Sequence, residues 1–298
     1  MNGASFRIGD AENGASWQNS ATSDIISALQ AIHDSRTDNE TRQRASAFLD
    51  SQKRSNQAAQ NGYGLAGNTT QPAVVRHFGL SLLEHTIRHD WLSFSDAQVL
   101  EIRDWTVSLS QSISDNDPLY LRNKIAHLLV EVAKKDWAIS WFDMDSSLMV
   151  LWKQDLRHKE LVLTVLENLS EDVFVREDSA AGLRGQDLHN AVVEIFTPAS
   201  AFAGGQNKAR HYLRADGDGW LARVSYFLAS ASSTGSNEGE TKACVCKALA
   251  TLRSAFTWVM GPAIITAHCL ECIFACLVSS DTDVLLVRNT VPRTALHP

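Results

Sequence analysis

One histidine and three cysteines near the carboxyl end of the sequence are of the residue types that commonly bind metal ions. They are His268, Cys269, Cys272 and Cys276. On a helix the three thiols share one face with Ile265, where cysteines pack as small apolar groups. A closed zinc site normally takes its ligands from two separated knuckles, and the remaining pair, Cys244 and Cys246, would point to opposite sides of a helix. We therefore expect buried, reduced thiols here and no metal.

Two further patterns could bind a cation. His85 and His89 are four residues apart, but their segment, EHTIRH, lacks the glutamate between two histidines that a zinc protease uses. Asp216 and Asp218 alternate with glycines as in a calcium loop, without its third acidic ligand and its closing glutamate. We expect solvated or packed histidines in the first case and a turn in the second.

Motifs of catalysis are missing from the sequence. It has no Gly-Lys-Ser/Thr phosphate loop, no nucleophile elbow and no paired acid and base. We therefore expect a protein that is not an enzyme and that needs no cofactor. Trp137 and Trp141 could form a binding platform, but tryptophans spaced four apart between two helices are more often core residues.

The composition is typical of a folded, acidic protein. The chain has 298 residues, of which 44% are hydrophobic and 20% charged, and its formal net charge is −7. This charge disfavours a general nucleic-acid binder and suits a basic partner. Polar residues, glycine and proline interrupt the longest apolar run, over residues 259–278, so we expect no membrane span. The first residues lack the pattern of a secretory signal, which predicts a reducing compartment.

Helical periodicity covers most of the chain. In the segment at residues 121–136, the apolar residues Leu121, Ile125, Leu128 and Val132 follow in steps of four, three and four, which draws one apolar stripe on a helix. A second short element follows at Trp141. A pair of short helices cannot bury its faces alone, so this unit needs similar neighbours on both sides.

The sequence predicts an all-α fold, an α-solenoid of HEAT type. Helix pairs are expected to open near residues 22, 72, 117, 156, 220 and 262. That makes about six pairs, with spacings that scatter around the two-helix repeat of about 40–47 residues. Residues 22–280 form the solenoid in this interpretation, residues 1–21 a disordered tail, and residues 281–298 an irregular end. Residues 55–71, rich in glycine and amides, are expected to be a loop.

Four segments, in order and with comparable spacing, resemble the amino-terminal HEAT repeats of the importin-β/karyopherin superfamily. They are VVRHFGLSLLEHTIRHDW (74–91), DWAISWFDM (136–144), LENLSEDV (166–173) and KALATLRSAFTWV (247–259). Over residues 22–278 the sequence looks most like the exportin-five (Hasty) type of nuclear export receptor. Two departures stand out. The Trp-Pro pairs of the family are Trp-Ala and Trp-Phe here, which favours a continuously helical turn, and family members are several times longer, so the chain looks like an amino-terminal piece or a truncated gene model.

The resemblance implies a transport receptor. Such a receptor binds the GTPase Ran in its GTP state together with RNA or protein cargo, crosses the pore through FG-repeat nucleoporins, and releases cargo on GTP hydrolysis. It would shuttle between nucleus and cytoplasm, and we expect a monomer. The alternatives are a HEAT-repeat scaffold or adaptor unrelated to transport, and a metal-binding helical protein.

The resemblance also suggests where Ran would bind. In the superfamily Ran lies against the second helices of the first few repeats, on the concave side. On the expected helix over residues 95–113, the residues that face away from the apolar stripe are Glu101, Asp104, Trp105 and Ser108. On the expected helix over residues 188–202 they are Asn190, Glu194 and Thr197. The alternative is an ordinary solvated face, which is the norm for charged helix residues.

Overall fold

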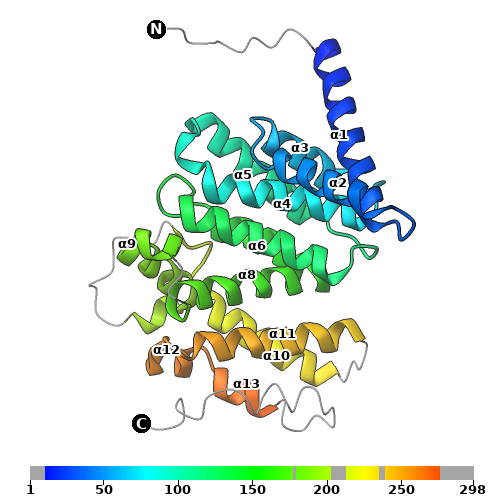
Figure 1. Cartoon of the computed structure of the whole chain (residues 1–298). Coiled ribbons are helices and arrows are strands. Elements are labelled where there is room, and N and C mark those ends of the chain that lie inside the picture. The colour runs from blue at the N-terminus through cyan, green and yellow to red at the C-terminus, as the bar shows by residue number, and fades with distance from the viewer. Residues whose placement is uncertain (1–10, 177–178, 203–212, 235–238, 276–298) are drawn as a thin grey trace, which may run out of the picture. The chain divides into compact units, whose positions relative to one another are not determined.

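The structure, a computed structural model, describes residues 11–176, 179–202, 213–234 and 239–275, with residues 11–21 described as backbone only (Figure 1). Within these ranges every regular element is a helix, apart from one isolated bridge between Trp137 and Trp141. The predicted all-α solenoid is confirmed for this part of the chain. None of the described helices is both long and apolar enough to cross a bilayer. The chain divides into two units, Met1–Trp105 and Thr106–Pro298.

Unit 1 consists of helices that pack on one apolar cluster. Its elements are α1 (Ala11–His33), α2 (Asn39–Gln52), α3 (Ala58–Gly67), α4 (Ala73–His89), η1 (Trp91–Ser93) and the first part of α5 (Asp96–Gln111). Residues from four of these helices, among them Ile25, Leu49, Leu65 and Leu82, form the buried core. The predicted tail covers residues 1–21; the first ten lie outside the described ranges, and α1 begins at Ala11.

Helix α3 corrects the prediction of a loop over residues 55–71. It packs closely against α4, because glycines on both helices let the two backbones touch. A Cβ atom built on Gly79 would lie 2.6 Å from the carbonyl oxygen of Gly62 and 2.7 Å from the amide nitrogen of Ala66. Glycine is unfavourable in an isolated helix, so the sequence looked like a loop. Here the absence of side chains is what allows the contact.

The presence of α3 changes which helices are first and second in their pairs. α1 packs on α2 and α3 packs on α4, so α2 and α4 are the second helices of unit 1. α1 also contacts α3, and the ring of Tyr63 on α3 stacks on Trp105 of α5 with centroids 4.8 Å apart. α1, α3 and α5 therefore form the layer of first helices. The sequence interpretation, without α3, had placed α5 in the second layer.

Unit 2 is also built of packed helices. Its elements after α5 are α6 (Leu119–Asp136), α7 (Met144–Trp152), α8 (Leu156–Phe174), α9 (Ser179–Phe196), η2 (Ala199–Ala201), α10 (Gly219–Thr234), α11 (Gly239–Ala255), α12 (Gly261–Thr266) and α13 (Cys269–Ala275). α6, α8 and α11 lie side by side (Figure 1), with α8 in the middle. α10 packs on α11, as expected for the pair that opens near residue 220, whereas α7, expected as the partner of α6, packs on α8.

The tryptophan pair lies in a tight turn and is part of the core. Trp137 is 0% and Trp141 2% exposed, which confirms the core interpretation. The expected continuous helix is wrong, because α6 ends at Asp136 and Ala138 has a φ of 61°. The Asp136 carbonyl accepts three amides of the turn, and Ser140 Oγ donates to the Asp136 carboxylate at 2.8 Å. These hydrogen bonds take the place of the regular backbone hydrogen bonds that a continuous helix would have.

The helix on which Ile265 and the three thiols were expected to share a face is split in two. Its break falls at His268, which has a φ of 52°. Cys269 and Cys272 on α13 are buried, as is Cys244, and Cys246 is half-buried. The four are free thiols, and the described residues contain no group of three potential metal ligands. Cys276 and the end expected to be irregular lie outside the described residues.

Gly79→Ala tests the close contact of α3 and α4. We expect the added methyl group to push the helices apart and to lower the free energy of unfolding by about 1–3 kcal/mol. Gly64→Ala is the matched control on α3, because a Cβ there meets nothing within 4 Å. It should raise stability by up to about 1 kcal/mol through helix propensity. Denaturant melts of both variants decide, and a neutral Gly79→Ala would contradict the contact.

Thiol reactivity tests the burial of the cysteines. Burial raises the pKa of the Cys244 and Cys269 thiols to about 12, and the thiolate is the reactive form. In the native chain we expect Cys246 to react with a maleimide well before either. Peptide mapping by mass spectrometry separates these sites from Cys276. Labelling of Cys269 as fast as Cys246 would show that α13 does not pack as described.

Candidate functional site

The structure brings the predicted α5 residues together on one face. Glu101, Asp104 and Ser108 are exposed, and Trp105 is half-buried. The Trp105 ring is already engaged, because it stacks on Tyr63 at an angle of 7° between ring planes. This face therefore offers two exposed carboxylates beside an aromatic ring that is only partly accessible. It belongs to the layer of first helices and not, as expected, of second ones.

The α9 residues do not form an exposed face. Glu194 is 4% exposed, and its side chain pairs with Arg214, whose Nη1 also donates to the Glu194 carbonyl at 2.7 Å. Thr197 is also buried, and half-buried Asn190 accepts a hydrogen bond from Gln186 at 2.8 Å. The expectation of an exposed α9 face is wrong for Glu194 and Thr197. The segment that carries Arg214 is packed against this helix, which a projection of one helix does not show.

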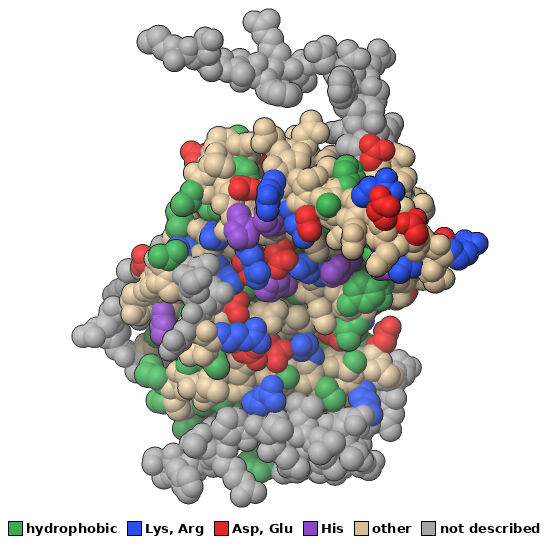
Figure 2. All heavy atoms as spheres, in the orientation of Figure 1, with side chains coloured by type: hydrophobic (Ala, Val, Ile, Leu, Met, Phe, Trp, Pro, Cys, Tyr) green, Lys and Arg blue, Asp and Glu red, His purple; other side chains and the backbone are tan. Residues whose placement is uncertain are grey.

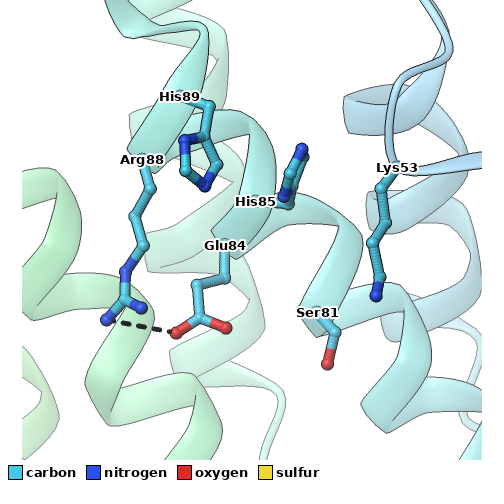
Figure 3. A pocket seen from close by; sticks show the side chains of 6 residues that line it. All are labelled: Lys53, Ser81, Glu84, His85, Arg88 and His89. Atoms are coloured by element: carbon cyan, nitrogen blue, oxygen red, sulfur yellow. Dashed lines mark ion pairs between the residues drawn. The ribbon is translucent and has the colours of Figure 1, made fainter. Parts of the chain in front are cut away.

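A different surface lies on α4, the second helix of its pair. Five polar residues at helical spacing share one side of α4, and Lys53 at the end of α2 completes a pocket of about 300 Å³ (Figure 3). The five are Ser81, Glu84, His85, Arg88 and His89. We call these six residues the α4 pocket. Figure 2 shows histidine side chains and side chains of both charges gathered over this helix.

The side chains of the α4 pocket fall into two groups. Arg88 pairs with Glu84 at 3.4 Å on one side, and Lys53 lies near His85 on the other (Figure 3). The rings of His85 and His89 have centroids 4.4 Å apart. The opposite side of α4 carries the buried residues Leu82, Leu83 and Ile87. The hydrophobic core thus holds α4 with its polar side outward.

Burial and nearby positive charge both lower the pKa of His85. Burial is the largest cause and the charge of His89 the next; Asp90 opposes them, and Lys53 and Arg54 lower the pKa further by smaller amounts. An acceptor group or anion that entered the pocket would relieve this repulsion. The arrangement suits polar contacts with a partner and offers no nucleophile with an adjacent base.

Sequence reasoning found only part of the α4 pocket. It noticed the spacing of His85 and His89 but considered them as metal ligands or as solvated and packed residues. Ser81, Glu84 and Arg88 continue the same spacing, so a polar stripe was visible in the sequence. Lys53 could not be associated with them, because its place depends on how α2 and α4 pack.

The pKa of His85 gives a test of the pocket's charge. We expect its ring to titrate below the usual value of about 6.5, and His89→Gln to raise its pKa by removing a nearby cation. Because the pKa is lowered in the folded state, the stability contributed by His85 is complete above about pH 6.5 and is lost as the pH falls. Ring chemical shifts followed by NMR measure both values. A midpoint at or above 6.5 in the unaltered chain would contradict this account.

Comparisons with known proteins find exportin-like relatives. Residues 118–199, which span α6 to α9, match the family described as exportin 1-like protein. The chain is 28% identical to Protein MSN5 of Saccharomyces cerevisiae over 274 residues, which are 87% of this chain and 22% of that protein.

Two other relatives are an exportin and a protein of the HASTY type. Exportin-5 of Mus musculus is 32% identical over 108 residues, 35% of this chain and 9% of that protein, and Protein HASTY 1 of Arabidopsis thaliana is 26% identical over 171 residues, 56% of this chain and 14% of that protein. The chain thus spans about a fifth or less of the length of the relatives it matches. With the helical stack, these matches confirm the resemblance drawn from the sequence: the chain is similar to exportin-type karyopherins of the exportin-five (Hasty) type.

Proposed function

We propose that this chain is the amino-terminal part of a nuclear export receptor, and that it binds Ran-GTP and contributes to carrying RNA or protein cargo through the nuclear pore. The main support is the match of residues 118–199 to the exportin 1-like family, together with the similarity to Protein MSN5 over 87% and to Protein HASTY 1 over 56% of this chain. Binding of FG-repeat nucleoporins, shuttling between nucleus and cytoplasm, and a monomeric state are parts of the same proposal.

The α4 pocket is our first candidate for the Ran contact. In the resembling superfamily the GTPase lies against second helices, and α4 is a second helix once α3 is counted. Its polar stripe, exposed at Arg88 and His89 and half-buried elsewhere, offers donors and acceptors of both charges, which suits a specific and salt-dependent contact. Glu101, Asp104, Trp105 and Ser108 on α5 are the second candidate, because they are accessible but lie in the other layer.

A pull-down with Ran tests the function and distinguishes the two surfaces. We expect the chain to retain Ran loaded with a non-hydrolysable GTP analogue and not Ran loaded with GDP. Arg88→Glu should weaken binding at least tenfold, about 1.4 kcal/mol, because it reverses a charge that is 44% exposed beside Glu84. Arg36→Glu is the control: the same change, at an 89% exposed side chain in the turn between α1 and α2.

If the α5 surface is the Ran contact instead, variants on α5 should weaken binding and Arg88→Glu should not. Trp105→Ala would then weaken binding by about 1–3 kcal/mol as a partly buried anchor, and Glu101→Lys with Asp104→Lys would also reduce it. Circular dichroism must show unchanged helix content, because Trp105 also packs on Tyr63. A chain that is folded but binds neither nucleotide state would refute the receptor proposal and leave the alternative, a HEAT-repeat scaffold or adaptor.

A further inference from the structure

Two side chains of the α4 pocket, His85 and His89, remain uncommitted. Neither ring makes a hydrogen bond or an ion pair with the described residues. The other lining side chains already have partners within the chain: Lys53 with Asp50 at 2.8 Å, Arg88 with Glu84 at 3.4 Å, and Ser81 Oγ with the carbonyl of His77 at 3.0 Å. A group that enters the pocket therefore meets the two imidazole rings as its free hydrogen-bonding groups.

Both rings can be reached from the pocket. His89 is exposed and His85 half-buried, and their ring centroids lie 4.4 Å apart with 45° between the ring planes (Figure 3). The ring nitrogens of His85 are not among the fully buried, unpartnered polar atoms of the described residues. The pocket has a volume of about 300 Å³, which leaves room for the polar end of a side chain next to the pair.

The charged groups that act on the pair are mostly positive. Burial lowers the pKa of His85 most and the charge of His89 comes next; Asp90 at the end of α4 raises the pKa, and Lys53 and Arg54 at the end of α2 lower it. α3, which also packs on α4, carries no charged residue. The pair thus lies among cations, with one opposing carboxylate beyond the end of its helix.

The group that fits this pair is an anion with acceptor oxygens. A carboxylate beside a histidine ring accepts a hydrogen bond from it and favours its protonated form. Such a charge-assisted hydrogen bond is shorter and stronger than one between neutral groups. A basic side chain would instead be repelled by Lys53 and Arg54. On the surface of a protein partner, the group with these properties is the side chain of an aspartate or a glutamate.

We propose that the α4 pocket receives a carboxylate side chain of its partner at the His85–His89 pair, and that the pair takes up a proton on binding. The inference rests on the proposed function, in which this partner is Ran-GTP, and adds the chemistry of the contact. Because the bound carboxylate stabilises the imidazolium form, the complex binds more protons than the separate proteins. By linkage, the affinity then rises as the pH falls through the range in which histidine titrates.

Calorimetry with the full chain and Ran loaded with a non-hydrolysable GTP analogue tests this coupling. We expect binding to be tighter by about threefold or more at pH 6.0 than at pH 7.5, and the binding enthalpy at pH 6.5 to vary with the ionisation enthalpy of the buffer in the sense of proton uptake. The double variant His85→Gln/His89→Gln keeps polar side chains that do not titrate, so it should lose the uptake and most of the pH dependence. His33→Gln, at an exposed histidine at the end of α1, is the matched control and should keep both.

The outcomes separate this inference from the proposed function. If the unaltered chain binds Ran without taking up a proton, or if the folded double variant retains the uptake, the inference is overturned and the receptor proposal stands. Affinity that decreases with falling pH overturns it as well, since the pair would then face a basic group. Absence of Ran binding at both pH values refutes the receptor proposal and this inference together. Circular dichroism shows whether each variant is folded, and His89→Gln alone, at an exposed position, gives the same comparison if the double variant is not.

Discussion

The central constraint in unit 2 is a buried charge on α6 that α8 must neutralise. Lys134 is 1% exposed, and its Nζ lies 2.8 Å from Glu131 and 2.9 Å from Asp172. Burial alone would lower the pKa of Lys134, but the two carboxylates raise it overall, so the ammonium stays charged. Because a buried charge without its partner is strongly unfavourable, α6 and α8 can pack in one register only. Two more carboxylates of α8 extend this arrangement: Glu160 pairs with Arg122 of α6 at 2.7 Å, and Glu167 with Lys247 of α11 at 2.7 Å. α8 thus fixes the positions of the helices on both of its sides.

Helices with strong apolar spacing could be predicted from the sequence, and contacts between helices could not. The stripe from Leu121 to Val132 placed α6 correctly, and the boundaries of α8 are close to those expected. α3 was missed because Gly62 and Gly64 resemble loop residues until the backbone of α4 is known to pass so near. The turn at Ala138 was missed for a related reason, since it is held by hydrogen bonds between Ser140 and Asp136 that the sequence does not announce.

The residues predicted to bind Ran on α5 and α9 show the same difference between properties of one helix and contacts between elements. A helical projection of α5 correctly identified Glu101, Asp104 and Ser108 as exposed. A projection considers one helix at a time, which was sufficient for these three residues. It was wrong for Glu194 because Arg214 comes from a segment twenty residues further on and pairs with it. It also placed α5 in the wrong layer, since one missed helix reverses the order of first and second helices in the pairs that follow. A repeat protein is sensitive to such an omission in a way that a sheet protein is not.

The contact between Gly62 and Gly79 has a mechanical consequence. At most helix interfaces, side chains act as a compliant layer that can change rotamer as the helices slide past each other. α3 and α4 meet backbone to backbone, so this interface has almost no compliant material and resists shear. Bending of unit 1 must therefore take place at its other joints, such as that between α1 and α2, where side chains fill the space. The α3–α4 pair is thus expected to behave as a stiff element, on which the five α4 residues of the pocket keep their mutual positions while Lys53 moves with α2.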